Sequence, residues 1–252
     1  MPPPTHLELL CTAFIRGLDA VLGDKLYAVY LYGAMAFPEA DAGGDVDLHA
    51  IVREPLTDVE KAGLKDLHAA LARDYPPSGA DMDGYYLLLD DARRTTPPVH
   101  QFLPGAIDRS WALHCANMRA GRCIRLRGPD PTEIYPAVSW PELEVALWQE
   151  HNFVAKHLPE YPDYCILNLC RLMYSFQTHV VVVSKRFSEA WAKAAFPQWS
   201  PLIGGARASY DRGHPDEDQT LLAARIAPFY EFAMEQIHAS LDQPQPEGAT
   251  LT

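Results

Sequence analysis

Long apolar runs and clusters of positive charge are both missing from this 252-residue sequence. No segment approaches the roughly 18 consecutive apolar residues of a membrane-spanning helix, and the first residues lack the basic and apolar segments of a secretory signal. Lysine and arginine total 21 against 33 aspartates and glutamates, a formal net charge of −12. Since nucleic acids are bound mainly through clustered basic residues, we expect a cytoplasmic protein with a cationic partner and no nucleic-acid or membrane partner. The oligomeric state stays open.

Cysteines and histidines at metal-binding spacing are missing as well. The cysteines form an odd set without a CxxC motif, which argues against a disulfide framework and a structural zinc site. We expect buried thiols in a reducing compartment. The histidines show no ligand spacing, so no transition-metal site is expected, and His114 and Asn117, on a helical stretch, are given no role. The five cysteines are Cys11, Cys115, Cys123, Cys165 and Cys170.

The first half of the sequence has the pattern of a small α/β domain. Apolar residues at intervals of three and four predict a helix over residues 7–22. The pair Thr57 and Glu60 predicts a capping box at the start of a second helix, over residues 57–74. Runs of β-branched and aromatic residues predict strands over residues 26–32, 45–52 and 85–89. This order of strands and helices predicts a small mixed sheet.

From about residue 140 the pattern becomes helical. Apolar periodicity predicts helices over residues 141–158, 164–179, 184–195, 200–211 and 216–241. Four prolines between residues 129 and 141 indicate a linker. We therefore expect an α/β domain over residues 1–135 and an all-α helical bundle over residues 136–252, of which residues 242–252 form a frayed tail.

Two aspartates at the start of the second predicted strand are candidate metal ligands. Asp45 and Asp47 are two residues apart, so in a strand they project to the same side with Cβ atoms about 6.5 to 7 Å apart. Two neighbouring carboxylates repel each other, and a divalent cation relieves the repulsion. Carboxylate oxygens suit Mg²⁺, whose remaining coordination positions are filled by water and substrate phosphates. The alternative is a solvated pair of acids beside a turn.

A third acid comes just before the third predicted strand. If that strand pairs beside the strand that carries Asp45 and Asp47, then Asp83 reaches the same metal cluster and can act as general base on an acceptor hydroxyl. Asp81, two residues earlier, is the alternative for this role. Either residue could also be an ordinary turn former.

Several motifs together resemble one family. Residues 31–34 (LYGA) and 44–48 (GDVDL) resemble the LYGS and SDxDL signature of the aminoglycoside adenylyltransferases, of the type that acts on streptomycin and spectinomycin. Residues 128–131 (GPDP) resemble the GPxP element at the domain junction of that family. Residues 167–175 (LNLCRLMYS) resemble its LxLxRxxYS helix, and similar segments follow at residues 184–192 and 208–210. The resemblance covers residues 28–212.

The resemblance implies a nucleotidyltransferase fold and the transfer of AMP from Mg-ATP to an aminoglycoside hydroxyl, with release of pyrophosphate. It implies that Asp45 and Asp47 bind two Mg²⁺ ions and that Asp83 completes the cluster and takes the hydroxyl proton. It also implies that the nucleotide is bound by the turn residues Gly33 and Ala34 and by Arg171, Lys185 and Tyr210.

Two of these cations can also be argued from their own surroundings. Arg171 lies in an apolar helix, where an unpaired charge is costly, so it needs an anion, which could be a phosphate or a structural glutamate. Lys185 follows Ser184, a candidate N-cap, and so occupies the first helical turn, where the helix dipole disfavours a cation. A bound phosphate would offset that placement, and an exposed surface pair with Arg186 is the alternative.

The resemblance also implies an acceptor pocket lined by aromatic and acidic residues. Its candidates are Trp148, Glu150, Glu160 and Asp163. The alternatives are ordinary surface acids and, for Trp148, a core aromatic residue.

The sequence departs from the family pattern at two positions. Ala34 and Gly44 replace two serines, so two hydroxyls that could bind the triphosphate are missing. Each lost hydrogen bond to a charged group could cost about 1.5 to 3 kcal/mol, although the backbone N–H groups of the turn remain. Two alternatives therefore stay open: a nucleotidyltransferase with another acceptor, and a nucleotide-binding protein without turnover.

Overall fold

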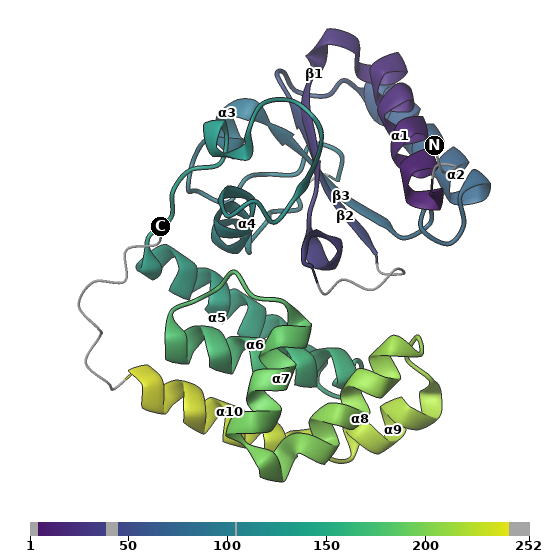
Figure 1. Cartoon of the computed structure of the whole chain (residues 1–252). Helices are drawn as coiled ribbons and strands as arrows, with labels where there is room; N and C mark the ends of the chain where they lie inside the picture. Colours follow the sequence, from purple (N-terminus) through teal and green to yellow (C-terminus); the bar gives the residue numbers. More distant parts are fainter. Residues whose placement is uncertain (1–4, 39–44, 104, 242–252) are drawn as a thin grey trace. The chain divides into compact units, whose positions relative to one another are not determined.

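The computed structural model describes residues 5–38, 45–103 and 105–241 (Figure 1). The chain divides into two compact units, Met1–Val138 and Ser139–Thr252. The first contains a sheet with helices and the second contains helices, so the predicted α/β plus all-α fold class is confirmed. The predicted tail at residues 242–252 lies outside the described residues.

The first unit is built on a four-stranded mixed sheet with the order β3-β2-β1-β4. β2 and β3 are parallel, whereas β1 is antiparallel to both β2 and β4. The third strand begins three residues earlier than predicted, because pairing with β2 brings the weak strand formers Asp83 and Gly84 into the ladder. The fourth strand was not predicted. The strands are β1 (Leu26–Leu31), β2 (Val46–Val52), β3 (Met82–Leu88) and β4 (Ile124–Arg127).

Helices cover both faces of this sheet (Figure 1). Since side chains alternate along β2, Leu48, Ala50 and Val52 pack with α1 and α2, whereas Ile51 packs with α4. Asp47 and His49 share the face of Ile51. The predicted capping box of Thr57 and Glu60 is confirmed at the start of α2. The helices of this unit are α1 (His6–Leu22), α2 (Asp58–Asp74), α3 (Leu89–Ala92) and α4 (Trp111–Arg119), with short 3-10 turns η1 (Gly23–Lys25), η2 (Gly33–Ala36) and η3 (Pro131–Glu133).

The second unit is arranged around α6, which is buried along most of its length. The other helices pack against it, and its fully buried segment from Cys165 to Cys170 forms the centre of this core. The elements are α5 (Trp140–His157), α6 (Pro162–Thr178), α7 (Lys185–Ala195), η4 (Pro197–Trp199), α8 (Ser200–Asp211), α9 (Asp216–Ala223) and α10 (Ile226–Leu241).

The predicted single helix over residues 216–241 is wrong, because the structure has two helices with a break at Ala224 and Arg225. Pro228 explains the break. In a continuous helix its ring would clash with the carbonyl of Ala224, and it has no N–H to donate. In the first turn of α10 neither problem arises, since the first N–H groups of a helix have no intrahelical partner.

None of the described helices is both long enough and apolar enough to span a membrane. All five cysteines are free thiols. Three of them, Cys115, Cys165 and Cys170, are buried, and Cys11 and Cys123 are half-buried.

Candidate functional site

Three carboxylates lie at one end of β2 and β3, and we call Asp45, Asp47 and Asp83 the acidic edge. Asp47 and Asp83 are directly paired in the parallel ladder, on strands about 4.8 Å apart, so their side chains leave the same face of the sheet. Asp45 directly precedes β2 and is exposed, as is Asp83, whereas Asp47 is half-buried. Asp83 was predicted to precede its strand but is the second residue of β3.

Asp81, the alternative third acid, lies outside the ladder. It precedes β3, and its carbonyl oxygen accepts a hydrogen bond from the N–H of Val46 at 2.9 Å. This bond closes the end of the β2 and β3 ladder. Asp83, rather than Asp81, therefore has the register position beside Asp47.

The turn after β1 packs tightly against Asp47. Gly33 has a φ of +74°, and a Cβ atom added there would lie 1.8 Å from Oδ2 of Asp47. The N–H of Tyr32 also donates to the carbonyl oxygen of Asp47 at 2.9 Å. Both the backbone conformation and the close approach therefore require glycine at position 33. Ala34 follows as an exposed residue of η2, and Gly44 lies outside the described residues.

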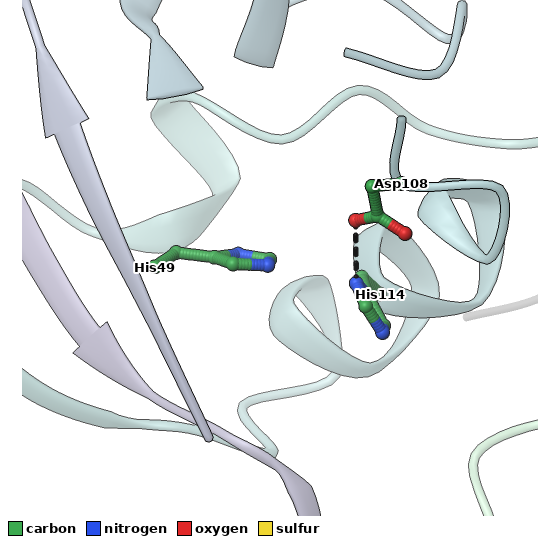
Figure 2. A group of neighbouring side chains, drawn as sticks. All are labelled: His49, Asp108 and His114. Carbon is green, nitrogen blue, oxygen red and sulfur yellow. Dashed lines mark hydrogen bonds and ion pairs between the residues drawn. The ribbon is translucent and has the colours of Figure 1, made fainter. Parts of the chain in front are cut away.

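Two histidines and an aspartate form a second group on the same face of the sheet, the histidine–aspartate cluster of His49, Asp108 and His114 (Figure 2). His49 comes from β2, Asp108 from the loop before α4, and His114 from α4. Nδ1 of His114 lies 2.7 Å from Oδ2 of Asp108, and the N–H of Ser110 donates to Oδ1 of Asp108 at 3.1 Å. His49 is fully buried, and its Nδ1 lies 3.0 Å from the hydroxyl of Tyr135.

Burial dominates the electrostatics of this cluster. Burial, and then the charge of the neighbouring His114, lowers the pKa of His49 to about 3. Burial by itself raises the pKa of Asp108, but the charge and hydrogen bond of His114, with smaller contributions from His49 and the Ser110 N–H, offset this, so the pKa of Asp108 is lowered. Tyr32, whose ring contacts both histidines, has a pKa well above its usual value because of burial and then the charge of Asp47. The neutral His49 ring and the Asp108 carboxylate are thus the forms present near neutral pH.

The sequence did not predict this cluster. No metal-ligand spacing was found among the histidines because the three residues come from separate segments that only the tertiary fold brings together. One signal was present: His49 follows Asp47 by two residues in a strand, so it lies on the same face as the acidic edge.

In the helical unit, the structure brings Lys185 and Tyr210 together. Nζ of Lys185 donates to the hydroxyl of Tyr210 at 3.4 Å and lies 4.2 Å from the centre of the Tyr164 ring. Ser184 caps α7 as predicted, accepting a hydrogen bond from the N–H of Phe187 at 3.0 Å. Lys185 is the first residue of α7, at the positive end of the helix dipole.

Arg171 lies near the same group. Its guanidinium is 3.5 Å from the carboxylate of Glu150, so the structural glutamate that sequence reasoning left as an alternative is present. Burial, and then the charge of Glu150, raises the pKa of Tyr164 to about 12, while Arg171 acts in the opposite direction. Arg171, Lys185, Tyr164 and Tyr210 therefore form one cationic, aromatic group on α6, α7 and α8.

The predicted acceptor-binding residues have different surroundings. Trp148 is half-buried and its ring packs against Phe176, while Glu160 is exposed. Asp163 is completely buried. Its carboxylate accepts hydrogen bonds from Ser209, His214 and Gln219 and from the N–H of Tyr164. This environment does not fit an acceptor-binding carboxylate, because the buried oxygens of Asp163 are already held by donors of the helical unit.

A solved structure shares the fold of this chain. The structure is similar to spectinomycin adenyltransferase AAD(9) from Enterococcus faecialis, solved with ATP and spectinomycin, with a TM-score of 0.71 over 91% of this chain and 98% of that one, at 14% identity. A tri-AMPylated Shewanella oneidensis HEPN toxin in complex with MNT antitoxin matches at 14% identity over 61% of this chain and 92% of that one, but its TM-score of 0.29 supports no argument.

The fold is that of a nucleotidyltransferase with a helical C-terminal part. Residues 133–236 match the family described as aminoglycoside adenylyltransferase, C-terminal domain. This match confirms the resemblance found in the sequence over the helical domain.

Proposed function

We propose that the protein transfers AMP from ATP to a hydroxyl of an aminoglycoside and releases pyrophosphate. The observation that carries the proposal is the pairing of Asp47 with Asp83 in the ladder, beside a glycine turn packed on the Asp47 carboxylate. The family of the helical domain and the ATP and spectinomycin held by the AAD(9) protein support this substrate pair. The free thiols favour a cytoplasmic location.

The acidic edge fits magnesium. It offers only carboxylate oxygens, the donors that Mg²⁺ prefers, and the approach of Gly33 leaves space at Asp47 that a side chain would fill. Asp45, Asp47 and Asp83 would hold the metal. When bound, Mg²⁺ neutralises charge on the triphosphate.

The protein residues then have separate tasks. Asp83 accepts the proton of the acceptor hydroxyl, whose oxygen attacks the α-phosphorus of ATP while the bond to the pyrophosphate oxygen breaks. The backbone of Gly33 and Ala34 lies beside the triphosphate in this proposal. Arg171, Lys185 and Tyr210 bind the nucleotide, whose negative charge suits both the two cations and the first turn of α7.

The acceptor is expected to be a polycation. The net charge of −12 favours such a molecule, and the exposed Glu160 together with Trp148 is proposed to contact it. Glu150 also pairs with Arg171, so it links the two predicted groups of residues.

Pyrophosphate release tests this proposal. We expect release in the presence of ATP, Mg²⁺ and one of streptomycin, spectinomycin or a kanamycin-type acceptor, and no release without an acceptor. Binding of ATP without release for any acceptor would contradict aminoglycoside transfer. That result would favour either a nucleotidyltransferase with another acceptor or a nucleotide-binding protein without turnover. Restoring the two hydroxyls by Ala34→Ser and Gly44→Ser distinguishes them, because a degenerate enzyme should gain activity whereas a dedicated binding protein should not.

Gly33→Ala should lower the rate of transfer by at least about 100-fold, or about 2.7 kcal/mol in the barrier. The new methyl group meets Oδ2 of Asp47, and a φ of +74° is strained for alanine, so the carboxylate and the turn cannot both keep their positions. Steady-state kinetics of pyrophosphate release measures the effect. Gly213→Ala is the matched control, since φ there is also positive but no atom lies within 4 Å of the added Cβ. Equal losses in both variants would contradict a specific role for the Gly33 turn.

Lys185→Met should weaken ATP binding by about 10- to 100-fold, because one charge-assisted contact to the nucleotide is lost while the length of the side chain is kept. Isothermal titration calorimetry with ATP measures this directly. Lys156→Met, at an exposed position near the end of α5, is the control and should bind ATP like the unmodified protein. An unchanged affinity in Lys185→Met would remove Lys185 from the nucleotide site.

A further inference from the structure

We propose that the histidine–aspartate cluster binds a divalent transition-metal ion of the Zn²⁺ class. This site is separate from the acidic edge, and the proposal does not depend on the adenylyl transfer proposed above. It would use one nitrogen from His49, one nitrogen from His114 and one carboxylate oxygen from Asp108.

The three side chains already converge. One ligand atom from each lies within 4.8 Å of the others. In a tetrahedral Zn²⁺ site with bonds of about 2.0 to 2.1 Å, ligand atoms lie about 3.3 to 3.4 Å apart. Small side-chain rotations therefore suffice to reach coordination distance, without movement of the sheet.

An unused nitrogen of His49 gives the second, independent observation. The side chain is fully buried, and its Nε2 has no hydrogen-bond partner among the residues that the structure describes. Figure 2 shows the ring extending from β2 toward Asp108 and His114. Buried polar atoms are nearly always partnered, so a lone Nε2 aimed at a carboxylate and a second imidazole points to a ligand. Its Nδ1 contacts the hydroxyl of Tyr135, the outer contact that orients a metal-binding histidine.

The other two residues are also held in place. The N–H of Ser110 donates to Oδ1 of Asp108, and Nδ1 of His114 lies against Oδ2 of the same carboxylate. A metal ion would replace the proton between Asp108 and His114. The His114 side chain is 19% exposed, while Asp108 is 2% exposed, so the cluster meets solvent on the His114 side. An ion can enter there, and a water molecule can fill the remaining position.

The donor set separates this site from the acidic edge. Two imidazoles and one carboxylate suit Zn²⁺, Co²⁺, Ni²⁺ or Fe²⁺, whereas three carboxylates suit Mg²⁺. The two sites should thus differ in metal preference, and a large excess of Mg²⁺ should fill the acidic edge without displacing a transition metal from the cluster.

Cobalt is a direct probe of the site. We would strip the full-length protein with EDTA, remove the chelator, and titrate Co²⁺ in the presence of millimolar Mg²⁺ while recording visible absorption. The proposal predicts a d–d band that saturates at one equivalent. Zn²⁺ should abolish the band and should raise the melting temperature of the stripped protein, because it binds the native state. Absence of a band at stoichiometric Co²⁺ would overturn the proposal.

Variants identify the ligands. His114→Gln and Asp108→Asn should each weaken Co²⁺ binding by at least about 100-fold. Asp47→Asn, at the acidic edge, and His238→Gln, at an exposed histidine of α10, should keep the band. A band that survives His114→Gln and Asp108→Asn in folded protein, as judged by circular dichroism, would contradict the assignment. So would a band that disappears in Asp47→Asn, which would place the ion at the acidic edge.

Discussion

Asp47→Asn should lower the rate of AMP transfer by at least about 1,000-fold, equivalent to about 4 kcal/mol in the barrier. Asp47 is the central carboxylate of the acidic edge, paired with Asp83 in the ladder and packed against Gly33. Asparagine has the same shape but no negative charge, so it removes a metal ligand while leaving the strand in place. Steady-state kinetics at saturating Mg²⁺, with thermal melting of the same samples, measures both effects.

The matched control for this variant is Asp81→Asn. Asp81 is an exposed aspartate close to the same strands, but its contact with β2 is made by its backbone carbonyl, which the substitution keeps. We expect its transfer rate to stay within about twofold of the unmodified protein. Undiminished transfer in Asp47→Asn would remove the metal role of the acidic edge. A loss in Asp81→Asn as large as that in Asp47→Asn would show that any charge change in this region is damaging.

Asp163→Ala should lower the free energy of unfolding by about 3 to 5 kcal/mol. The carboxylate is fully buried in the helical unit, where it joins α6 to α8, to α9 and to the segment between them. Removing it leaves the hydroxyl of Ser209, the ring of His214 and the amide of Gln219 without their common acceptor. The Ser209 hydroxyl is buried, so leaving it unpaired carries a desolvation cost of about 1 to 3 kcal/mol, and the lost hydrogen bonds from His214 and Gln219 add to this cost. Urea unfolding followed by circular dichroism measures the loss.

Glu160→Ala provides the comparison, because Glu160 is an exposed acid just before α6 and should change stability by no more than about 0.5 kcal/mol. A stability loss below about 1 kcal/mol in Asp163→Ala would show that this network does not hold the helices together. If acceptor binding were then lost with stability intact, the role that the sequence suggested for Asp163 would be restored.

The features that the sequence predicted well are those determined by interactions between residues close together in the sequence. The capping box of Thr57 and Glu60 starts α2 because both of its hydrogen bonds are made within four residues. Ser184 caps α7 for a similar reason. The run of strand-forming residues predicted over 45–52 placed Asp47 near the start of a strand, because that pattern depends only on neighbouring residues, although β2 begins at Val46 and Asp45 directly precedes it.

The features that were missed depend on tertiary contacts. β3 starts at Met82 because β2 offers a pairing edge, although Asp83 and Gly84 have low strand propensity. The burial of Asp163 depends on donors 46 to 56 residues away in the sequence. The same holds for the histidine–aspartate cluster, whose members are spread over three segments and show no spacing that a sequence pattern could reveal.

The most direct test of the central claim is mass spectrometry of the acceptor after incubation with ATP, Mg²⁺ and protein, comparing the unmodified chain with Asp83→Asn and Asp81→Asn. We expect an aminoglycoside that carries one AMP group with the unmodified protein and with Asp81→Asn. With Asp83→Asn it predicts none, although this variant still binds ATP. An adenylylated product from Asp83→Asn at the unmodified rate, or its loss only in Asp81→Asn, would contradict the assignment of Asp83 as the base at the acidic edge.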